Sequence, residues 1–590
     1  MGLIRLSLDG GGSAPLPAGS STFDGPIAAL EYLAAALDEL STGDPHDLQK
    51  PARIDTGGGP QRADLPFALV AGLVGGSGAP GTARCAAIGI SPLSGGVAET
   101  RAEGPFAAGL RAAGVTGVVL DGRASSPVCV VVSEGRAWTE PAGDLWGSET
   151  GPATDRLLER YGSGAAVAVV GPAGERQIPY ASIVTCRHHP LPRLGLGAVL
   201  GAKYVKAIVA VGDAPVPPAS PAAVTRIAAD YSVSARSNKL TVWQRAMPGF
   251  GVWAGEPGYA PVDGFTDTTR GGGLGVVPDA IARAASVAAC PGCPTDCIKV
   301  YAGAGLHQEA LAMLGPNAGI ADPWPLLARC EQLGLDPVEL GAAVATSGLS
   351  SADVQRAFLG ATAAPPAQAS PAQASPAPVS LAQVPPAAAS AALELVQSLS
   401  PAAVVSKGVA IPPFDPRVQP NLGLAYAVSP IGPRYDLIEH DLDFDPDEGM
   451  PSSFPEMRRL GVTVPRPRGV LDVDGTAQLM RLWSGLDALG VCVFAATPTR
   501  PLLLAQVEDL VEAVTGQRPD VLALGAERLR LQFAVNQRLG LGPSDDTLPD
   551  RFFDEPVRAG RYAGSVLDRV AFGAAVTALR ESLEITGLVP

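Results

Sequence analysis

The chain has 590 residues, of which 46% are hydrophobic and 17% charged, and its formal net charge is −15. That length exceeds what one hydrophobic core supports, so we expect about two to four domains. The acidic balance disfavours nucleic acid and anionic membranes as partners. Residues 1–10 alternate like a first strand, not like a signal peptide, and the lack of an apolar run of about 18 residues excludes a transmembrane helix. Few, scattered cysteines indicate a cytoplasmic protein rather than a disulfide framework.

Residues 1–212 are predicted to form a strand-rich domain. Short apolar runs bounded by glycine or proline predict strands at 67–71, 86–90, 117–120, 128–132 and 165–170. Helices are predicted between these strands at 28–40 and 106–113.

The rest of the chain is predicted to be mainly helical. Residues 213–360 are rich in alanine and leucine, and helices are predicted at 222–231, 278–289, 308–314 and 323–333. Residues 361–390 contain no aromatic residue and repeat Ala-Gln-Ala-Ser-Pro, so this segment is predicted to be a disordered insertion. The third region, 391–590, predicts helices at 391–399, 475–489, 502–514 and 526–539.

Three of the eight cysteines lie in one short run, Cys290-Pro-Gly-Cys293-Pro-Thr-Asp-Cys297. Thiolates at such spacing are typical of zinc or an iron–sulfur cluster. Zinc sites favour paired Cys-x2-Cys units or added histidines, and His307 is the only histidine nearby, so the spacing favours a cluster and leaves zinc as the alternative. A fourth ligand must come from elsewhere, and Cys492 is the best candidate. A ligand so distant in sequence indicates a site built by the whole fold, as in a cofactor enzyme.

The cysteines and their surroundings resemble the tungsten/molybdenum aldehyde ferredoxin oxidoreductase family. The resemblance extends over most of the chain outside the insertion, in segments 78–84, 91–96, 122–127, 171–175, 195–208, 290–297, 307–309, 314–320, 406–408, 414–417, 487–492 and 547–552. It implies an α+β fold in which a strand-rich N-terminal base domain is followed by two mainly helical domains that enclose the cofactor.

The resemblance also implies the cofactors and the residues that hold them. A [4Fe-4S] cluster would be bound by Cys290, Cys293, Cys297 and Cys492, beside a tungsten or molybdenum bis-pyranopterin. The residues implied for the pterins are Arg84 between cluster and pterin, Arg193 near the phosphates, Asp487 and Val491 in one segment, and Glu331 and Asp336 in its sister segment. Each has an ordinary alternative, namely a surface arginine, a glycine-rich turn, an exposed helix-end acid or, for Cys492, a buried apolar cysteine.

Two further residues are implied to act on the substrate. Glu309 matches the glutamate beside the metal and would transfer a proton, the alternative being an acid favoured at a helix N-terminus. Tyr435 stands where aldehyde-oxidising members have a histidine. Arg101 replaces an asparagine that helps to hold magnesium between the pterin phosphates, so a magnesium ion is in doubt here. The hypothesis is that the fixed charge of Arg101 takes its place.

These departures leave two functions open. The first is a cytoplasmic oxidoreductase that oxidises an aldehyde, or reduces a carboxylate-level compound, and exchanges electrons with ferredoxin or an iron–sulfur partner subunit. The substrate would be a small carbonyl compound, and the resemblance leaves room for a homodimer. The second is an electron-transfer or assembly subunit that keeps the cluster but has no competent pterin centre.

Overall fold

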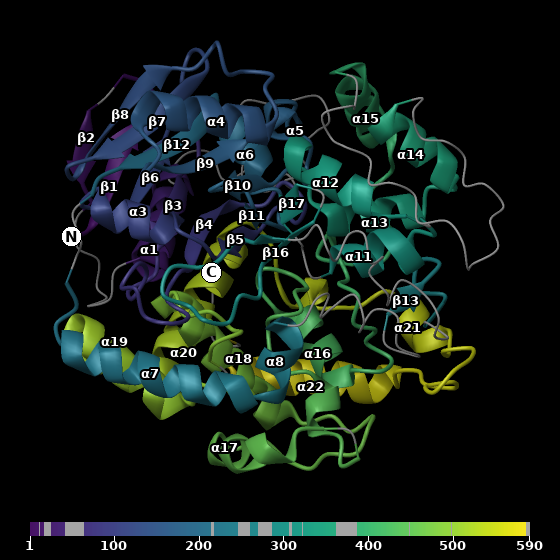
Figure 1. Ribbon diagram of the computed structural model, residues 1–590. Helices are drawn as coiled ribbons and strands as arrows, with labels where there is room; N and C mark the ends of the chain where they lie inside the picture. The colour runs from purple at the N-terminus through teal and green to yellow at the C-terminus, as the bar shows by residue number, and fades with distance from the viewer. Residues whose placement is uncertain are drawn as a thin grey trace.

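The computed structural model (Figure 1) describes residues 1–10, 12–16, 25–41, 64–213, 217–245, 260–268, 286–301, 303–305, 309–320, 322–360, 386–447, 449–496 and 498–585. The N-terminal part is built on two six-stranded sheets, which run from purple to blue in the figure. Helices make up most of the remainder, so the predicted α+β architecture is confirmed. No described helix is both long enough and apolar enough to span a bilayer.

The first sheet has the strand order β2-β1-β6-β3-β4-β5. Strands β1 and β6 are parallel, and every other neighbouring pair is antiparallel. The parallel strand β6 and its neighbour β3 are apolar and almost wholly buried, as expected for strands covered on both faces. The strands are β1 (Leu3–Ser7), β2 (Ser13–Pro15), β3 (Phe67–Ala71), β4 (Cys85–Ile90), β5 (Val97–Ala102) and β6 (Gly117–Asp121).

The second sheet repeats the topology of the first. Read from β8, its order is β8-β7-β12-β9-β10-β11, which is the first order with six added to each strand number. Again one pair, β7 and β12, is parallel and the others are antiparallel. The two halves are therefore related as a structural duplication, with β3 equivalent to β9. The strands are β7 (Val128–Ser133), β8 (Arg136–Pro141), β9 (Ala166–Val170), β10 (Ile183–Thr185), β11 (His189–Leu191) and β12 (Val205–Val211).

The helices between the strands follow the same duplication. Helix α1 (Pro26–Ser41) precedes β3 as α4 (Thr150–Tyr161) precedes β9, and α3 (Phe106–Ala112) precedes β6 as α6 (Leu196–Ala202) precedes β12. In α4 the apolar and small residues are buried and the charged ones exposed, which fixes the face that lies on the sheet.

The remaining helices form two groups (Figure 1). One group, teal and at the upper right, comprises α12 (Trp324–Leu333), α13 (Pro337–Ala345), α14 (Ser351–Leu359) and α15 (Pro386–Ser398). The other lies below the sheets and comprises α16 (Pro420–Val428), α18 (Val473–Leu489), α19 (Leu504–Thr515), α20 (Val521–Arg538) and α22 (Arg569–Ser582). Helix α7 (Pro221–Ser237) runs along α19, and the amides of Ala219 and Ser220 donate to α19 carbonyls.

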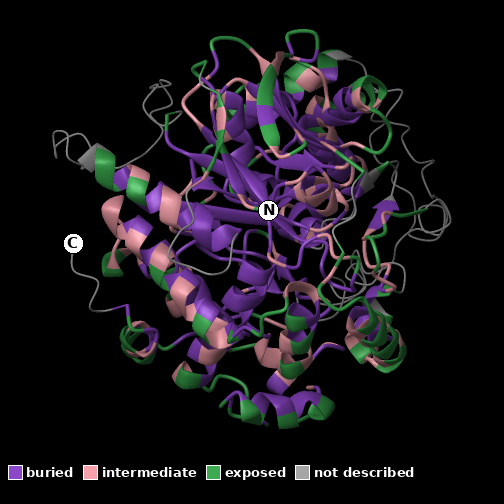
Figure 2. Cartoon of the chain, turned by 90° about the vertical axis from the view of Figure 1, so that its left-hand side faces the viewer, coloured by how far each residue is buried: buried purple, intermediate pink, exposed green. Residues whose placement is uncertain are grey.

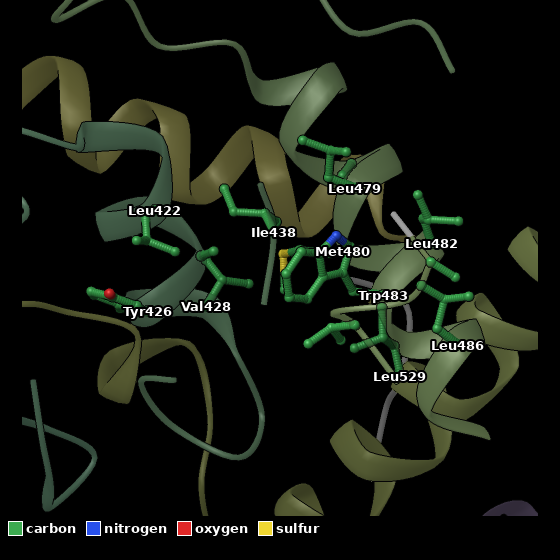
Figure 3. Close-up of a cluster of buried hydrophobic side chains, with 14 of the residues drawn as sticks. Leu422, Tyr426, Val428, Ile438, Leu479, Met480, Leu482, Trp483, Leu486 and Leu529 are labelled. Atoms are coloured by element: carbon green, nitrogen blue, oxygen red, sulfur yellow. The ribbon is translucent and has the colours of Figure 1, made fainter. Parts of the chain in front are cut away.

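The lower helices have a hydrophobic core of their own, distinct from that of the first sheet. Buried residues fill the interior and exposed ones the surface of the chain (Figure 2). In the lower group, Met480, Trp483 and Leu486 of α18 face Leu529 of α20 and Ile438 (Figure 3). Each such side chain contributes roughly 1.5–3 kcal/mol when fully buried. This packing holds α18, and hence the segment that follows it, in a fixed position.

Three sequence-based predictions need correction. The helix predicted at 278–289 is wrong at its described end, because Ser286–Val287 pair with β16 (Lys299–Tyr301) as strand β15, and 269–285 lie outside the described residues. The helix predicted at 308–314 begins at Ala310 and becomes a π-helix over Met313–Asn317, where Pro316 offers no amide hydrogen. Residues 386–390 of the predicted insertion belong to α15, and 361–385 lie outside the described residues.

Candidate active site

The cysteine triplet lies in the loop of the β15–β16 hairpin. Within this loop the amide of Cys293 donates to the carbonyl of Cys290 over 3.1 Å, which closes a tight turn. Cys290, Cys293 and Cys297 are all partly exposed. Solvent therefore reaches part of each of these residues, which lie on a short hairpin stem.

The segment after β3, residues 72–84, joins this loop to Cys492. Gly292 packs on it so closely that a Cβ would come within 1.9 Å of the Gly78 carbonyl oxygen. Further along, the Gly81 carbonyl accepts a hydrogen bond of 2.8 Å from the amide of Cys492. Gly81 has a φ of +76°, and a Cβ there would lie 2.4 Å from that of Ala495. Glycine at these positions lets one loop bring the predicted fourth cysteine to the triplet.

All the resolved thiol shifts in this region favour the neutral form. Burial raises the pKa of Cys297 to about 12, and Cys293 raises it further. Burial and Glu103 also raise the pKa of Cys492 well above its usual value, against the opposing charge of Arg84. A metal group that binds thiolates here would therefore release protons. In the described part of the chain, no three His, Cys, Asp or Glu side chains are grouped as ligands of one metal ion.

The two sister segments predicted from the sequence, 331–336 and 487–492, have the same backbone geometry. Helix α12 ends at Gly334 with φ +71°, and α18 ends at Gly490 with φ +76°. In both, the residue after the glycine donates its amide to the carbonyl five residues earlier over 2.8 Å. This is the Schellman ending, which a glycine in the left-handed region permits.

Each of these helix ends rests on the equivalent strand of one half of the duplication. Gly72 follows β3, and a Cβ on it would lie 2.2 Å from Cα of Gly490. Gly171 follows β9, and a Cβ on it would lie 2.8 Å from the amide nitrogen of Gly334. The sheet repeat therefore holds two similar helix ends in equivalent places.

The acids of segment 331–336 are already engaged by the protein. The Glu331 carboxylate contacts His188 Nδ1 at 2.9 Å and accepts from the amide of Gly305 at 2.7 Å. Asp336 caps α13, accepting from the amide of Val338 at 2.8 Å and from that of Arg193 at 2.5 Å. Asp336 thereby fixes the backbone that carries Arg193.

A cavity of about 100 Å³ lies against these elements. It brings together six of the predicted site residues, namely Arg84, Arg101, Arg193, Cys297, Glu309 and Tyr435. The other predicted site residues, Cys290, Cys293, Cys492, Glu331, Asp336, Asp487 and Val491, do not line it. The rest of its lining is Glu103, His188, His189, Pro190, Pro192, Ile298, Arg434, Asp436 and Phe494.

A buried ion-pair network forms one wall of this cavity. Asp487 contacts Arg84 at 2.6 Å and Arg101 at 2.8 Å, and Arg101 also contacts Asp436 at 3.3 Å. Burial opposes ionisation of Asp436, but Arg434 and Arg101 hold its pKa below the usual value. Burial likewise lowers the pKa of Arg101, in part offset by Asp487. The further members are Glu99, Glu103 and Arg528.

Several polar atoms around the cavity have no partner within the described chain. These atoms are Nε and Nη1 of Arg193, Nη1 of Arg434, Oε1 of Glu309 and Nδ1 of His189. The side chains of Arg193, Arg434 and Glu309 are at least 95% buried. Unpaired buried polar groups cost about 1–3 kcal/mol each, so the site is built to receive a group that supplies hydrogen-bonding atoms.

Glu309 and Tyr435 are the two candidate proton carriers of the cavity. Burial raises the pKa of Glu309 to about 8, against the opposing charge of Arg193. Tyr435 as a residue is half-buried. Burial raises the pKa of its hydroxyl well above the usual value, and the charge of Asp436 raises it further. Both shifts favour the protonated form of the group.

Comparison with protein families gives two matches, and both are to domains of one family. Residues 52–212 match the family model "Aldehyde ferredoxin oxidoreductase, N-terminal domain", and residues 387–587 match "Aldehyde ferredoxin oxidoreductase, domains 2 & 3". Together they cover more than half of the chain. The chain belongs to the aldehyde ferredoxin oxidoreductase family.

Two relatives and one solved structure are similar to this chain. The tungsten-containing aldehyde ferredoxin oxidoreductase of Pyrococcus furiosus is 26% identical over 550 residues, 84% of each chain. That of Thermococcus kodakarensis is 24% identical over 557 residues, 85% of this chain and 84% of the relative. In fold, the active-site complex BamBC of benzoyl coenzyme A reductase matches with a TM-score of 0.65 and 16% identity, over 99% of both chains. At this identity the last match supports the fold alone.

The carboxylates that hold the arginines of the cavity in place were not predicted from the sequence. Asp436 lies two residues after Arg434 and pairs with it at 2.8 Å, and Glu99 lies two residues before Arg101 and contacts it at 3.5 Å. Glu103, just after strand β5, pairs with Arg84 instead. Charged residues in the otherwise apolar strand β5 were the available signal, because a buried strand holds charges only when they are paired.

Proposed function

We propose that this family member is an oxidoreductase with a tungsten or molybdenum bis-pyranopterin and a [4Fe-4S] cluster. It would oxidise an aldehyde, or reduce a carboxylate-level compound, in the cytoplasm, and exchange electrons with ferredoxin or an iron–sulfur partner. The observation that carries the proposal is the pair of similar helix ends, Gly334 and Gly490, on equivalent strands of a duplicated sheet. Two equivalent helix ends would suit a cofactor that has two equivalent halves.

The residues around the cavity fit such a cofactor. The unpartnered N–H groups of Arg193 match the acceptor oxygens of phosphate. Asp487 is paired with three arginines, but a carboxylate has about four lone-pair sites and keeps capacity for a pterin N–H group. When bound, the metal–pterin centre would take up the substrate's two electrons, and the cluster would pass them on singly.

The four cysteines are proposed to hold the cluster. Cys492 lies beside the loop that carries Arg84, and Arg84 also pairs with Asp487 of the same segment. We propose that Arg84 would contact both the cluster and a pterin, as its fixed charge and five donors allow. The partly exposed triplet gives electrons a short way to a partner at the surface.

Glu309 and Tyr435 would handle protons and orient the substrate. A protonated Glu309 can donate a proton to an oxygen of the reacting group, or take one when it is ionised. The neutral Tyr435 hydroxyl can donate a hydrogen bond. Tyr435 stacks on Phe494, with ring centroids 6.4 Å apart and planes inclined by 17°, so its ring position is fixed.

One observation favours the second candidate, a subunit that holds only the cluster. Arg101 bridges Asp487 and Asp436, so the acid proposed for one pterin is held in an ion pair without it. If a pterin is bound, we propose that this cation serves where magnesium would otherwise join the phosphates.

Metal analysis of anaerobically purified protein tests the proposal. We expect about four iron atoms and one tungsten or molybdenum per chain, with oxidation of aldehydes coupled to viologen reduction. Iron without tungsten or molybdenum would favour the cluster-only subunit. Zinc alone would refute both candidates.

A further inference from the structure

A tyrosine of helix α7 is hydrogen-bonded to the cysteine loop. The buried face of α7 carries Tyr231 between two smaller apolar residues. The Tyr231 hydroxyl forms a hydrogen bond of 2.7 Å with the hydroxyl of Thr295. Thr295 lies between Cys293 and Cys297 in the loop, and both Tyr231 and Thr295 are only 1% exposed. This contact ties the loop that carries the cysteine triplet to α7.

The two hydroxyls carry one O–H more than their mutual hydrogen bond uses. Each hydroxyl has one O–H, and a bond between the two consumes only one of them. A phenol is a stronger acid than an aliphatic alcohol and hence the better donor to an anion. The favoured order is therefore that Thr295 donates to Tyr231 and that Tyr231 donates onward. A donor in so buried a place is costly unless it finds an acceptor.

The thiols of the proposed cluster lie near this donor. Burial raises the pKa of Tyr231, and the negative charge of Cys293 raises it further, with smaller contributions from Cys492 and Cys297. Tyr231 also belongs to the same hydrophobic cluster as Cys492. These shifts favour the protonated form of the Tyr231 hydroxyl, which is the form that can donate to sulfur.

Two of the other thiols already receive hydrogen bonds from the backbone. The amide of Phe494 donates to Sγ of Cys492 over 3.4 Å. Burial raises the pKa of Cys290, and a hydrogen bond from the backbone of Gly104 opposes this shift. Donors at these two thiols and a hydroxyl near a third would together stabilise negative charge on a cluster.

We propose that the Tyr231 hydroxyl, supported by Thr295, donates a hydrogen bond to a sulfur at the Cys293 corner of the bound [4Fe-4S] cluster and thereby raises the reduction potential of the cluster. This inference rests on the proposed function, but only on its cluster, so it applies to the oxidoreductase and to the cluster-only subunit alike. Reduction adds one negative charge to the cluster. A hydrogen bond to sulfur therefore stabilises the reduced form more than the oxidised form.

Dye-mediated redox titration of the anaerobically purified protein tests this role, with iron measured in each preparation and the reduced cluster followed by electron paramagnetic resonance. Tyr231→Phe should keep its iron, and the ratio of reduced to oxidised cluster at the wild-type midpoint should fall about tenfold, which is about 59 mV for one electron. Thr295→Val loses only the supporting hydrogen bond and should shift the potential less, in the same direction. Tyr562→Phe is the matched control, because Tyr562 is 3% exposed and belongs to a separate hydrophobic cluster.

The direction of the shift separates a hydrogen bond from mere packing. Loss of packing alone would admit water, whose dipoles stabilise the added charge, so an unchanged or raised potential in iron-loaded Tyr231→Phe would overturn the inference. An equal shift in Tyr562→Phe would do the same. If Tyr231→Phe binds too little iron to titrate, Thr295→Val decides, since a lowered potential supports the hydrogen bond and an unchanged one refutes it. A wild type without iron would refute the proposed function, and this inference with it.

Discussion

Replacing Glu309 by glutamine should make the folded chain more stable in alkaline solution while leaving it unchanged in mild acid. Burial raises the pKa of Glu309 from 4.5 to about 8 in the folded chain. Between these values the unfolded chain has lost the proton and the folded chain keeps it. The stability that this group contributes is complete below pH 4.5 and is lost as the pH rises towards 8.

The size of the effect follows from one proton. At about 1.4 kcal/mol per pH unit, the wild type should lose on the order of 3 kcal/mol between pH 5 and pH 8 through this carboxyl. Glutamine keeps the shape and cannot ionise, so Glu309→Gln should escape this loss. Other buried acids shift both proteins equally, and the difference between the two proteins isolates Glu309.

Urea unfolding of protein made without tungsten and molybdenum would measure this difference. The midpoints of wild type and Glu309→Gln should coincide near pH 5 and diverge towards pH 8, with the variant more stable. Glu394→Gln on α15 is the control, because Glu394 is exposed and its carboxylate stays in water. A variant that is less stable than the wild type at pH 8 would refute the reasoning, since Glu309 would then be an ionised partner of Arg193. In loaded enzyme the same substitution should keep the metals and slow turnover roughly 10²- to 10⁴-fold.

Substitutions at Cys492, Tyr435 and Gly81 test the site further. Cys492→Ser should lower iron content and visible absorbance as strongly as Cys293→Ser, and full iron loading without serine coordination would remove Cys492 from the ligands. Tyr435→Phe should slow turnover by less than about 10-fold if the hydroxyl only orients the substrate, and Tyr435→His should raise the relative rate with simple aldehydes; an unchanged substrate profile would contradict the role. Gly81→Ala should lower the melting temperature and iron content together, because its Cβ would lie 2.4 Å from that of Ala495; unaltered iron would show that the loop does not set the position of Cys492.

Several strands of the N-terminal part were predictable because their composition leaves few alternatives. The runs at 67–71, 117–120 and 128–132 are short, apolar and bounded by turns, and each is a buried strand. Strand β5 was not predicted, because its Glu99, Thr100 and Arg101 are polar and nevertheless buried. Strands buried by a network of charges carry no apolar pattern.

The duplication of the sheet could not be found from the sequence. The two halves share strand order and pairing, yet β5 reads Val-Ala-Glu-Thr-Arg-Ala and its counterpart β11 reads His-Pro-Leu. Backbone pairing sets topology, and many apolar sequences satisfy it equally. The two sister helix ends, by contrast, can be recognised in the sequence. Both require a glycine in the left-handed region followed by a buried apolar residue.

The placement of charge explains how the chain can keep eight ionisable side chains in one network beside the cavity. Arginines 84, 101, 434 and 528 pair with acids 99, 103, 436 and 487 in one buried network. Four charges of each sign balance, which avoids the roughly 3–5 kcal/mol that one uncompensated buried charge would cost. Asp436 holds Arg434 through Nε and Nη2, and Nη1 of this cavity-lining arginine has no acceptor in the described chain. The network thus fixes the arginines during folding without exhausting their donors, and the donors left over define what the site can bind.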